Sequence, residues 1–445
     1  MSTSTNLLRR REVIDALRRG AVPKRGLDLY ATGMTRFEKT FEEELESVAA
    51  GRGVFKALRG DFGCGKSFTA RWLQQFAQAR GFATSEVQIS ENDTPLHRLE
   101  TVYRRVTENL RTPDCQEGAF RALVENWFFG LEDEAMQSGA DPENLPEFTA
   151  AVAQSLEARL AEVSAIQPQF AAALRTCHHA RVHGDQATVD GLMAWLMGQP
   201  NVGASIKRQA GIKGDLDHTG ALAFLRGLLV MLRQTGRKGL ILVLDEVETI
   251  QRVRGDVRNR SLNALRQLID DVSSERFPGL YLMITGTPAF YDGPQGVKRL
   301  EPLAQRLHVE FGPDPAFDST RSIQVRLSPF NHARLVEVGK RVRDIYPSDD
   351  ADRITAKVND EIIEDLASGV AGKLGGKTGI APRIFLRKLV GELLDKVDEH
   401  PTYEPRQHFK LVVDAQEMKL EERAASGIET DPNAIALDLG ESDPE

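Results

Sequence analysis

The sequence predicts an α/β protein in which a parallel sheet is covered by helices on both faces. Short, nearly continuous apolar runs at 240–244 (LILVL), 280–284 (LYLMI) and 323–327 (IQVRL) are typical of buried parallel strands. Helical patterns separate these runs from two earlier strand-like segments, 54–59 and 82–89. Because strands that alternate with helices build three layers, we expect a three-layer α/β core.

Composition narrows the class of protein. The chain has 445 residues, so we expect two or three domains, and its 41% hydrophobic residues are enough for a substantial core. No apolar run approaches the ~20 residues that span a bilayer, and the N-terminus lacks an apolar secretory signal, so we expect a cytoplasmic protein without a membrane contact. The three cysteines fit a reducing compartment. A net charge of −8 gives no general attraction to nucleic acid.

Changes in pattern along the chain predict its domain organisation. Prolines and glycines divide long helical stretches, and strands occur only before and after the longest of these. The expected regions are an N-terminal helical segment (1–50), an α/β core in two parts (51–94 and 236–330), a large helical insertion (95–235), a C-terminal helical lid (331–400), an extension (401–423) and an acidic flexible tail (424–445).

Residues 60–67, GDFGCGKS, match the phosphate-binding pattern G-x-x-x-x-G-K-[ST] between a predicted strand and a predicted helix. The glycines let backbone N–H groups approach a phosphate, and the N-terminus of the helix adds positive charge. We expect Lys66 to reach the β- and γ-phosphates of ATP and Ser67 to bind Mg²⁺. The residues expected to contact ATP here are Gly60, Asp61, Phe62, Gly63, Cys64, Gly65, Lys66, Ser67 and Phe68.

Two further readings concern this pattern. Cys64 is interpreted as an ordinary loop residue and not as a reactive thiol. A second GKT, at 376–378, lacks both a preceding strand and a glycine five residues before Gly376, so we interpret it as a turn between lid helices.

Asp245 and Glu246 follow the apolar strand 240–244. This position places both carboxylates at the carboxyl edge of the sheet, where ligands of open α/β folds bind. We expect Asp245 to hold Mg²⁺ and Glu246 to activate the attacking water. A solvated acidic loop is the alternative for this motif taken alone.

Three more residues are candidates for supporting roles, each with a plain alternative. Thr285 directly follows the strand 280–284 and is placed to form a hydrogen bond with the water or the γ-phosphate, although threonine is also a common strand residue. Arg306 follows on a short helix and is placed to reach the γ-phosphate of a neighbouring subunit, or is a surface arginine. Arg383 begins the last lid helix and is placed to contact the phosphates, or pairs with a nearby acid.

These motifs, in this order, resemble the AAA+ ATPases, nearest to the branch of origin-recognition and STAND-type proteins. The resemblance covers about residues 20–400. The stretches 10–33, 87–106 and 239–252 are also similar to the BrxD group of P-loop ATPases from BREX phage-defence loci. This resemblance implies a bacterial or archaeal ATP-binding protein with defence-system partners such as a helicase.

The long separation of Lys66 from Asp245 departs from a compact AAA+ core, and we interpret 95–235 as an insertion that offers a surface for a partner or for DNA. Its aromatic clusters at 127–129 and 195–197 are more typical of core packing than of binding. His179 and His183 share a helix face but lack further metal-ligand partners.

Two groups of arginines allow DNA contact, although acidic residues lie among them. They are Arg9, Arg10, Arg11, Arg18 and Arg19 near the N-terminus, and Arg252, Arg254, Arg258 and Arg260 after the acidic pair.

We therefore expect an ATPase that couples its nucleotide state to a partner complex or to DNA. A slow or inactive ATP-dependent switch, and a motor that moves on or remodels DNA as a homo-oligomer, remain alternatives. A small-molecule kinase is less expected because no acceptor site is evident, and a GTPase is disfavoured because the chain has no N-K-x-D stretch.

Overall fold

The computed structural model describes residues 3–373 and 381–411 of the chain. These residues divide into two compact units. The first, called here the helical unit, contains residues up to Gly33, the segment Gly60–Phe68 and the residues from Ser328 onward. The second, called the sheet unit, contains Met34–Arg59 and Thr69–Leu327.

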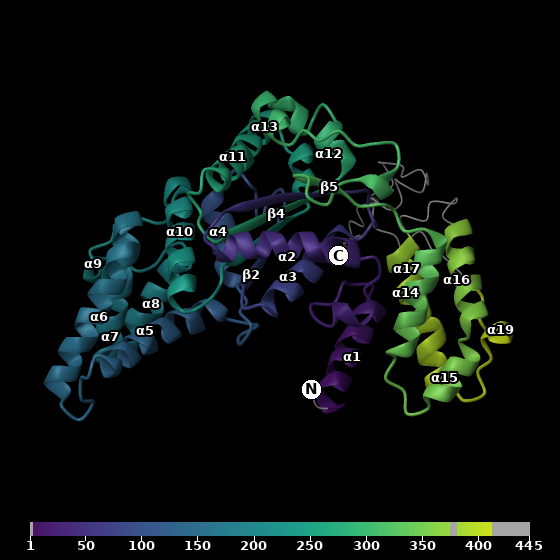
Figure 1. Ribbon diagram of the computed structural model, residues 1–445, viewed down its shortest axis with the longest axis horizontal. Helices are drawn as coiled ribbons and strands as arrows, with labels where there is room; N and C mark the ends of the chain where they lie inside the picture. The colour runs from purple at the N-terminus through teal and green to yellow at the C-terminus, as the bar shows by residue number, and fades with distance from the viewer. Residues whose placement is uncertain (1–2, 374–380, 412–445) are drawn as a thin grey trace, which may run out of the picture. The chain divides into compact units, whose positions relative to one another are not determined.

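The sheet unit is built around five strands, all parallel, in the order β2-β3-β4-β1-β5 (Figure 1). The predicted parallel α/β architecture is therefore confirmed. The strands are β1 (Val54–Arg59), β2 (Ala83–Gln88), β3 (Leu240–Asp245), β4 (Leu280–Gly286) and β5 (Gln324–Arg326). β3 and β4 are buried along their whole length, which explains why both read as unbroken apolar runs.

Helices cover both faces of this sheet. On one face, Leu242 and Leu244 of β3 line a small apolar cavity together with residues of α4 (Leu99–Glu108), α10 (His218–Gln234) and α11 (Gly255–Ser273). On the other face lies α2 (Thr35–Ala49), whose Phe41 packs near Trp72 of α3 (Lys66–Gln78). Two short helices, α12 (Pro288–Asp292) and α13 (Glu301–Arg306), follow β4.

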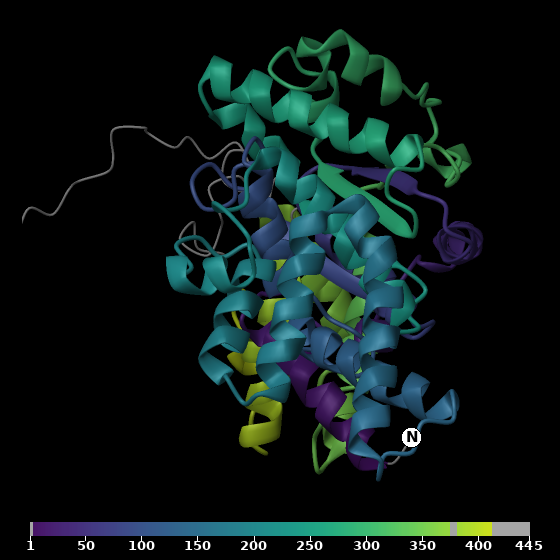
Figure 2. The same ribbon diagram turned by 90° about the vertical axis from the view of Figure 1, so that its left-hand side faces the viewer.

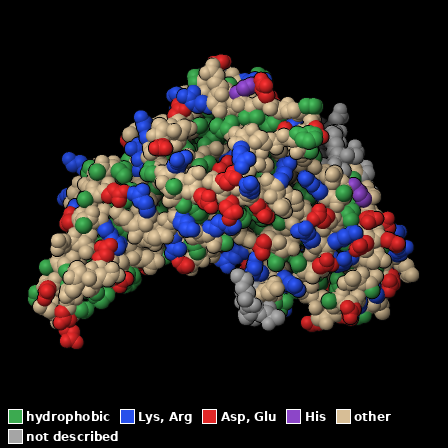
Figure 3. Space-filling view, in the orientation of Figure 1, with side chains coloured by type: hydrophobic (Ala, Val, Ile, Leu, Met, Phe, Trp, Pro, Cys, Tyr) green, Lys and Arg blue, Asp and Glu red, His purple; other side chains and the backbone are tan. Residues whose placement is uncertain are grey.

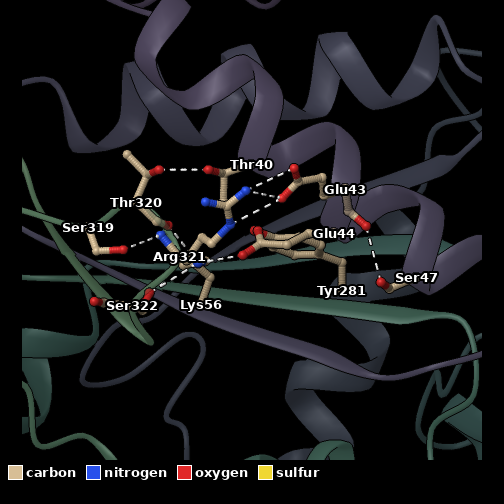
Figure 4. Close-up of polar contacts among 10 residues, drawn as sticks. All are labelled: Thr40, Glu43, Glu44, Ser47, Lys56, Tyr281, Ser319, Thr320, Arg321 and Ser322. Atoms are coloured by element: carbon tan, nitrogen blue, oxygen red, sulfur yellow. Dashed lines mark hydrogen bonds and ion pairs between the residues drawn. The ribbon is translucent and has the colours of Figure 1, made fainter.

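A buried ionic network joins α2 to the sheet and to the segment before β5 (Figure 4). The ammonium of Lys56, on β1, is 2.5 Å from Oε1 of Glu44 and donates hydrogen bonds of 3.0 Å to the carbonyls of Thr320 and Ser322. Tyr281 of β4 donates from its hydroxyl to the other oxygen of Glu44 over 2.7 Å. All three donors of the lysine thus have acceptors, which is what a buried ammonium requires.

The stretch between β2 and β3 is built of helices. Besides α4 and α10 these are α5 (Ala119–Gln137), α6 (Leu145–Ile166), α7 (Pro168–Val182), α8 (Gln186–Leu196) and α9 (Ala204–Gln209). Neighbours in sequence from α5 to α8 pack side by side (Figures 1 and 2). Asp185 caps the N-terminus of α8, because its side chain accepts a hydrogen bond from the backbone N–H of Thr188.

The aromatic residues of this stretch are mainly core residues, as their sequence context indicated. Trp127 and Phe128 are buried, and Trp195 is 3% exposed. The indole of Trp127 donates to the side chain of Gln234 over 2.7 Å. Phe129 differs, since half of it is exposed.

The helical unit joins the N-terminal helix to the C-terminal helices. Arg18 of α1 (Thr3–Arg18) makes a two-point ion pair with Asp395, at 2.6 and 2.9 Å, and the hydroxyl of Tyr346 donates to the same carboxylate. The other helices are α14 (His332–Asp344), α15 (Ala351–Lys357), α16 (Asp360–Lys373), α17 (Ala381–Lys388), a π-helical segment (Leu389–Leu394), α18 (Asp395–Glu399) and α19 (Pro405–His408).

Two predicted features lie outside the described residues: the turn containing the second GKT and the acidic tail 424–445. None of the helices within 3–373 and 381–411 is both long and apolar enough to cross a membrane.

Candidate functional site

The glycine-rich segment leads from the carboxyl end of β1 directly into α3, which begins at Lys66. Gly63 and Gly65 have φ values of 78° and 93°, a region that side chains with a Cβ rarely adopt. The ammonium of Lys66 is folded back over the segment and donates to the carbonyls of Gly60 (2.9 Å) and Asp61 (3.2 Å). A strand, a glycine turn and a helix N-terminus therefore follow one another as the motif requires.

Cys64 lies in this turn and is buried. Burial raises the pKa of its thiol to about 11, despite the opposing charge of Lys66. A thiol that stays protonated at neutral pH is a poor nucleophile, so Cys64 fits the role of a packed loop residue.

Thr285 connects the two acidic residues of the second motif. Its hydroxyl donates a hydrogen bond to Oδ1 of Asp245 and accepts one from the backbone N–H of Glu246 over 3.1 Å. Thr285 is fully buried and Asp245 is 6% exposed. Parallel pairing of β3 with β4 brings Leu244 opposite Ile284, so the next residues, Asp245 and Thr285, meet at the carboxyl edge of the sheet.

Glu246 has an unusual backbone. Its φ of 59° and ψ of 42° are in the left-handed region, which costs a residue with a Cβ about 1 kcal/mol or more. At Glu246 the chain turns out of the strand. The hydrogen bond from the backbone N–H of Glu246 to the hydroxyl of Thr285 helps to hold this conformation.

Gln88 also contacts Glu246, and the sequence did not single it out. Gln88 ends β2, where it pairs with Asp245, and its side-chain amide donates to Oε2 of Glu246 over 2.8 Å. The one signal available in the sequence was a polar residue near the end of a strand, which many strands have. The edge of the sheet therefore gathers Gln88, Asp245, Glu246 and Thr285.

Arg306 makes its contacts within its own chain. Its guanidinium forms an ion pair with Asp270 of α11 and donates to the carbonyl of Pro302 over 2.7 Å. The side chain is 38% exposed. Its predicted contact with a neighbouring subunit stays a prediction.

Arg383 lies in the first turn of α17, within the helical unit. Its side chain packs beside Gly20, just after α1, together with that of Arg387. Its predicted contact with the phosphates likewise stays a prediction.

The arginines that follow Glu246 lie near oxygen atoms of neighbouring residues in the sequence. Arg258 donates to the carbonyls of Gln251 (2.7 Å) and Val253 (2.8 Å), while Arg254 and Arg260 lie within 3.7 and 3.2 Å of the carboxylate of Asp256. Lys and Arg side chains are interspersed with Asp and Glu on the face in Figure 3. Neither observation identifies a strongly basic surface.

His179 and His183 do share a helix face, with ring centroids 4.0 Å apart. No group of three or more potential metal ligands occurs within the part of the chain that the structure describes. A two-histidine pair without a third ligand does not make a transition-metal site.

A phosphate-loop segment and a buried carboxylate at the sheet edge are typical of a nucleotide-binding protein, and one comparison with known proteins agrees. A search of curated proteins found no match. The family model described as "BREX system ATP-binding protein BrxC/D" matches residues 6–413, which is most of the chain. The chain therefore belongs to this family of ATP-binding proteins of the BREX defence system.

Proposed function

We propose that the chain is an AAA+-type ATPase of the BrxD group, which binds ATP with Mg²⁺ and hydrolyses it for a BREX complex. The observation that carries the proposal is the position of Thr285 between Asp245 and Glu246. The buried hydroxyl of Thr285 binds the carboxylate of Asp245 but only the backbone of Glu246. This difference supports different roles for the two acidic residues. Asp245 is the buried one, suited to a cation, and Glu246 follows it at the edge.

The glycine loop supplies the phosphate site in this proposal. Because Gly60 is bonded to Arg59, the last residue of β1, the loop begins at the edge where β3 and β4 also end. Lys66 already donates to two backbone carbonyls. Phosphate oxygens are stronger acceptors, and the ammonium is expected to exchange one or both carbonyls for them.

Oxygen ligands suit Mg²⁺, and the chain offers them in the hydroxyl of Ser67 and the carboxylate of Asp245. When bound, the ion would neutralise charge on the β- and γ-phosphates. Thr285 would keep Asp245 in a fixed rotamer through its hydrogen bond to Oδ1.

Glu246 is the proposed base that orients and deprotonates the attacking water. The strand order supports this arrangement, since β4 separates β1 from β3. Neighbouring strands are about 4.8 Å apart, so the carboxyl ends of β1 and β3 are about 10 Å apart across the sheet.

A slow switch is the second candidate, and two contacts favour it. Gln88 holds the carboxylate of Glu246, and Asp270 holds the guanidinium of Arg306. A protein whose base and arginine are both engaged would bind ATP and hydrolyse it slowly until a partner released them. Such a partner would be another defence-system protein such as a helicase, DNA, or a further copy of the chain in a homo-oligomer.

Purified protein with the variants Lys66→Ala and Glu246→Gln tests the proposal. We expect wild type to bind ATP with Mg²⁺ in calorimetry, Lys66→Ala to lose binding, and Glu246→Gln to bind ATP without turnover. Phosphate release measured with and without duplex DNA, beside mass measured with and without ATP, separates ATPase, switch and DNA motor. Wild type that binds no ATP would contradict the proposal.

A further inference from the structure

Arg59 is the last residue of β1 and the residue to which the glycine loop is attached. Its guanidinium donates from both terminal nitrogens to the carboxylate of Asp292 on α12, one of them over 3.0 Å. The side chain is only 14% exposed, although that of Asp292 is 53% exposed. A two-point bond of this kind fixes the plane of the guanidinium as well as its position.

Aromatic rings hold the same guanidinium. The carbon at its centre is 5.8 Å from the ring centroid of Tyr291 and 5.3 Å from that of Phe311. The hydroxyl of Tyr291 donates to the carbonyl of Leu58, over 3.4 Å. An arginine that lies against aromatic rings can still form its hydrogen bonds. The side chain of Arg59 is therefore restrained both by the rings and by Asp292.

The backbone of Arg59 is held as well. It pairs with Gly286 at the end of β4, and its carbonyl accepts from the N–H of Leu327, just after β5, over 2.8 Å. Thr285, which joins Asp245 to Glu246, precedes Gly286. The attachment point of the loop is therefore tied on both sides to the strands that end at the same edge.

Phe311 also contacts a second arginine, and this one provides a comparison. Arg326, at the end of β5, lies 4.9 Å from the ring centroid of Phe311 and makes a two-point ion pair with Asp318 at 2.8 and 3.0 Å. Arg59 and Arg326 thus have the same kind of ion pair and the same aromatic neighbour. Arg326 also donates to the carbonyl of Gly312 over 2.9 Å, and its partner Asp318 is 8% exposed where Asp292 is 53% exposed. Of the two arginines, only Arg59 is bonded to the glycine loop.

We propose that Arg59 is a positioning residue for the phosphate site: its bond to Asp292 fixes where the glycine loop starts in relation to the β4 end that carries Thr285. This inference rests on the proposed function. A phosphate-binding loop works through the directions of its backbone N–H groups, and an error of about 1 Å in such a site costs up to a hundredfold in rate. Arg59 contributes through Asp292 and not by touching the nucleotide.

The test uses the full chain with the variants Arg59→Gln, Arg59→Lys, Asp292→Asn and, as the matched control, Arg326→Gln. Calorimetry gives the Kd for ATP with Mg²⁺, and thermal unfolding gives the Tm of each variant without nucleotide. We expect Arg59→Gln to raise the Kd about tenfold, because the loop loses its fixed start. Asp292→Asn should give a similar increase, and Arg59→Lys a smaller one, because lysine keeps the charge but not the two-point geometry.

Arg326→Gln removes a comparable ion pair and should lower the Tm by a similar amount, while it leaves the Kd unchanged. A merely structural role for Arg59 predicts instead that the Kd of both arginine variants changes equally, and that result would overturn the inference. So would an unchanged Kd in Arg59→Gln. A loss in Arg59→Gln with none in Asp292→Asn would show direct nucleotide contact, which also overturns positioning through Asp292. If wild type binds no ATP, the proposed function fails along with the inference, whereas normal binding by Arg59→Gln defeats the inference alone.

Discussion

The side-chain amide of Gln88 donates to Oε2 of Glu246 over 2.8 Å, although Gln88 ends β2 and Glu246 follows the end of β3. This bond draws electron density from the carboxylate that we propose as the base, and it holds the side chain at the edge of the sheet. In the proposed mechanism, Gln88 is therefore placed to restrain turnover.

Replacement of Gln88 by leucine removes that donor with little change in size. We expect kcat for ATP to rise a few-fold, because the bond that is lost is worth about 1 kcal/mol, while the KM stays the same. Phosphate release measures both constants. Gln116→Leu is the control, since Gln116 donates to the carbonyl of Thr112 and to Gln78, and no such bond joins it to Glu246. A fall in kcat as large as that in Glu246→Gln would show that Gln88 assists the reaction.

Thr285→Val tests the hydroxyl that joins the acidic pair. Valine fills the same space but leaves Asp245 and the N–H of Glu246 without that partner, so we expect a loss of stability of about 1–3 kcal/mol and a fall in kcat of at least tenfold. Denaturant unfolding and phosphate release give the two quantities. Thr84→Val is matched, because Thr84 is also fully buried and accepts one bond from Gln78. Equal kcat values for the two valine variants would count against a role for Thr285 beyond packing.

The Lys56 network predicts a strong and partner-dependent effect on stability. Lys56→Met leaves Glu44, whose side chain is 17% exposed, without its cation and should lower the free energy of unfolding by about 3 kcal/mol. The double variant Lys56→Met with Glu44→Gln should recover part of this, since it removes the unpaired charge. Arg321→Ala breaks the pair with Glu43 in the same region (Figure 4), but both side chains are exposed, so its loss should stay below about 1 kcal/mol. Equal losses for Lys56→Met and Arg321→Ala in denaturant titration would refute this ranking.

Cys64 provides a prediction about pH. The pKa of its thiol is about 11 in the folded chain, against 9.0 for an unperturbed thiol, because burial disfavours the thiolate. Between these values the unfolded state binds fewer protons than the folded state, so stability should fall as pH rises through this window. Alkylation of Cys64, followed by mass spectrometry, should be slow at pH 8 and should accelerate toward pH 11. Rapid labelling at pH 8 in the folded state would contradict the burial of the thiol.

Much of the sheet was predictable because its signals are local. The strand 240–244 and the strand 280–284 each consist of consecutive buried residues, and the glycine pattern requires only a strand before it and a helix after it. The acidic pair followed from its place at the end of such a strand. Each of these signals depends on a few residues that are neighbours in the sequence, so it can be recognised in a single sequence.

The contacts that join separate elements were not predictable in the same way. Gln88 meets Glu246 because β2 pairs with β3 in one register, and the helical stretch between those strands gives no indication of it. The bond from Arg59 to Asp292 and the pair of Arg306 with Asp270 depend likewise on the packing of distant helices. The left-handed backbone of Glu246 is held by Thr285, which comes much later in the chain.

The position of β1 in the sheet also affects how the chain is assembled during synthesis. The neighbours of β1 are β4 and β5, which are synthesised much later. Val54 can pair only after Tyr281 has been synthesised, and Ala57 can pair with β5 only after Gln324 has been synthesised. The helices from α5 to α8 contact their neighbours in sequence and can associate as soon as they emerge from the ribosome. The strand that leads into the glycine loop is thus synthesised early and paired late, and until then its unpaired edges are exposed to aggregation.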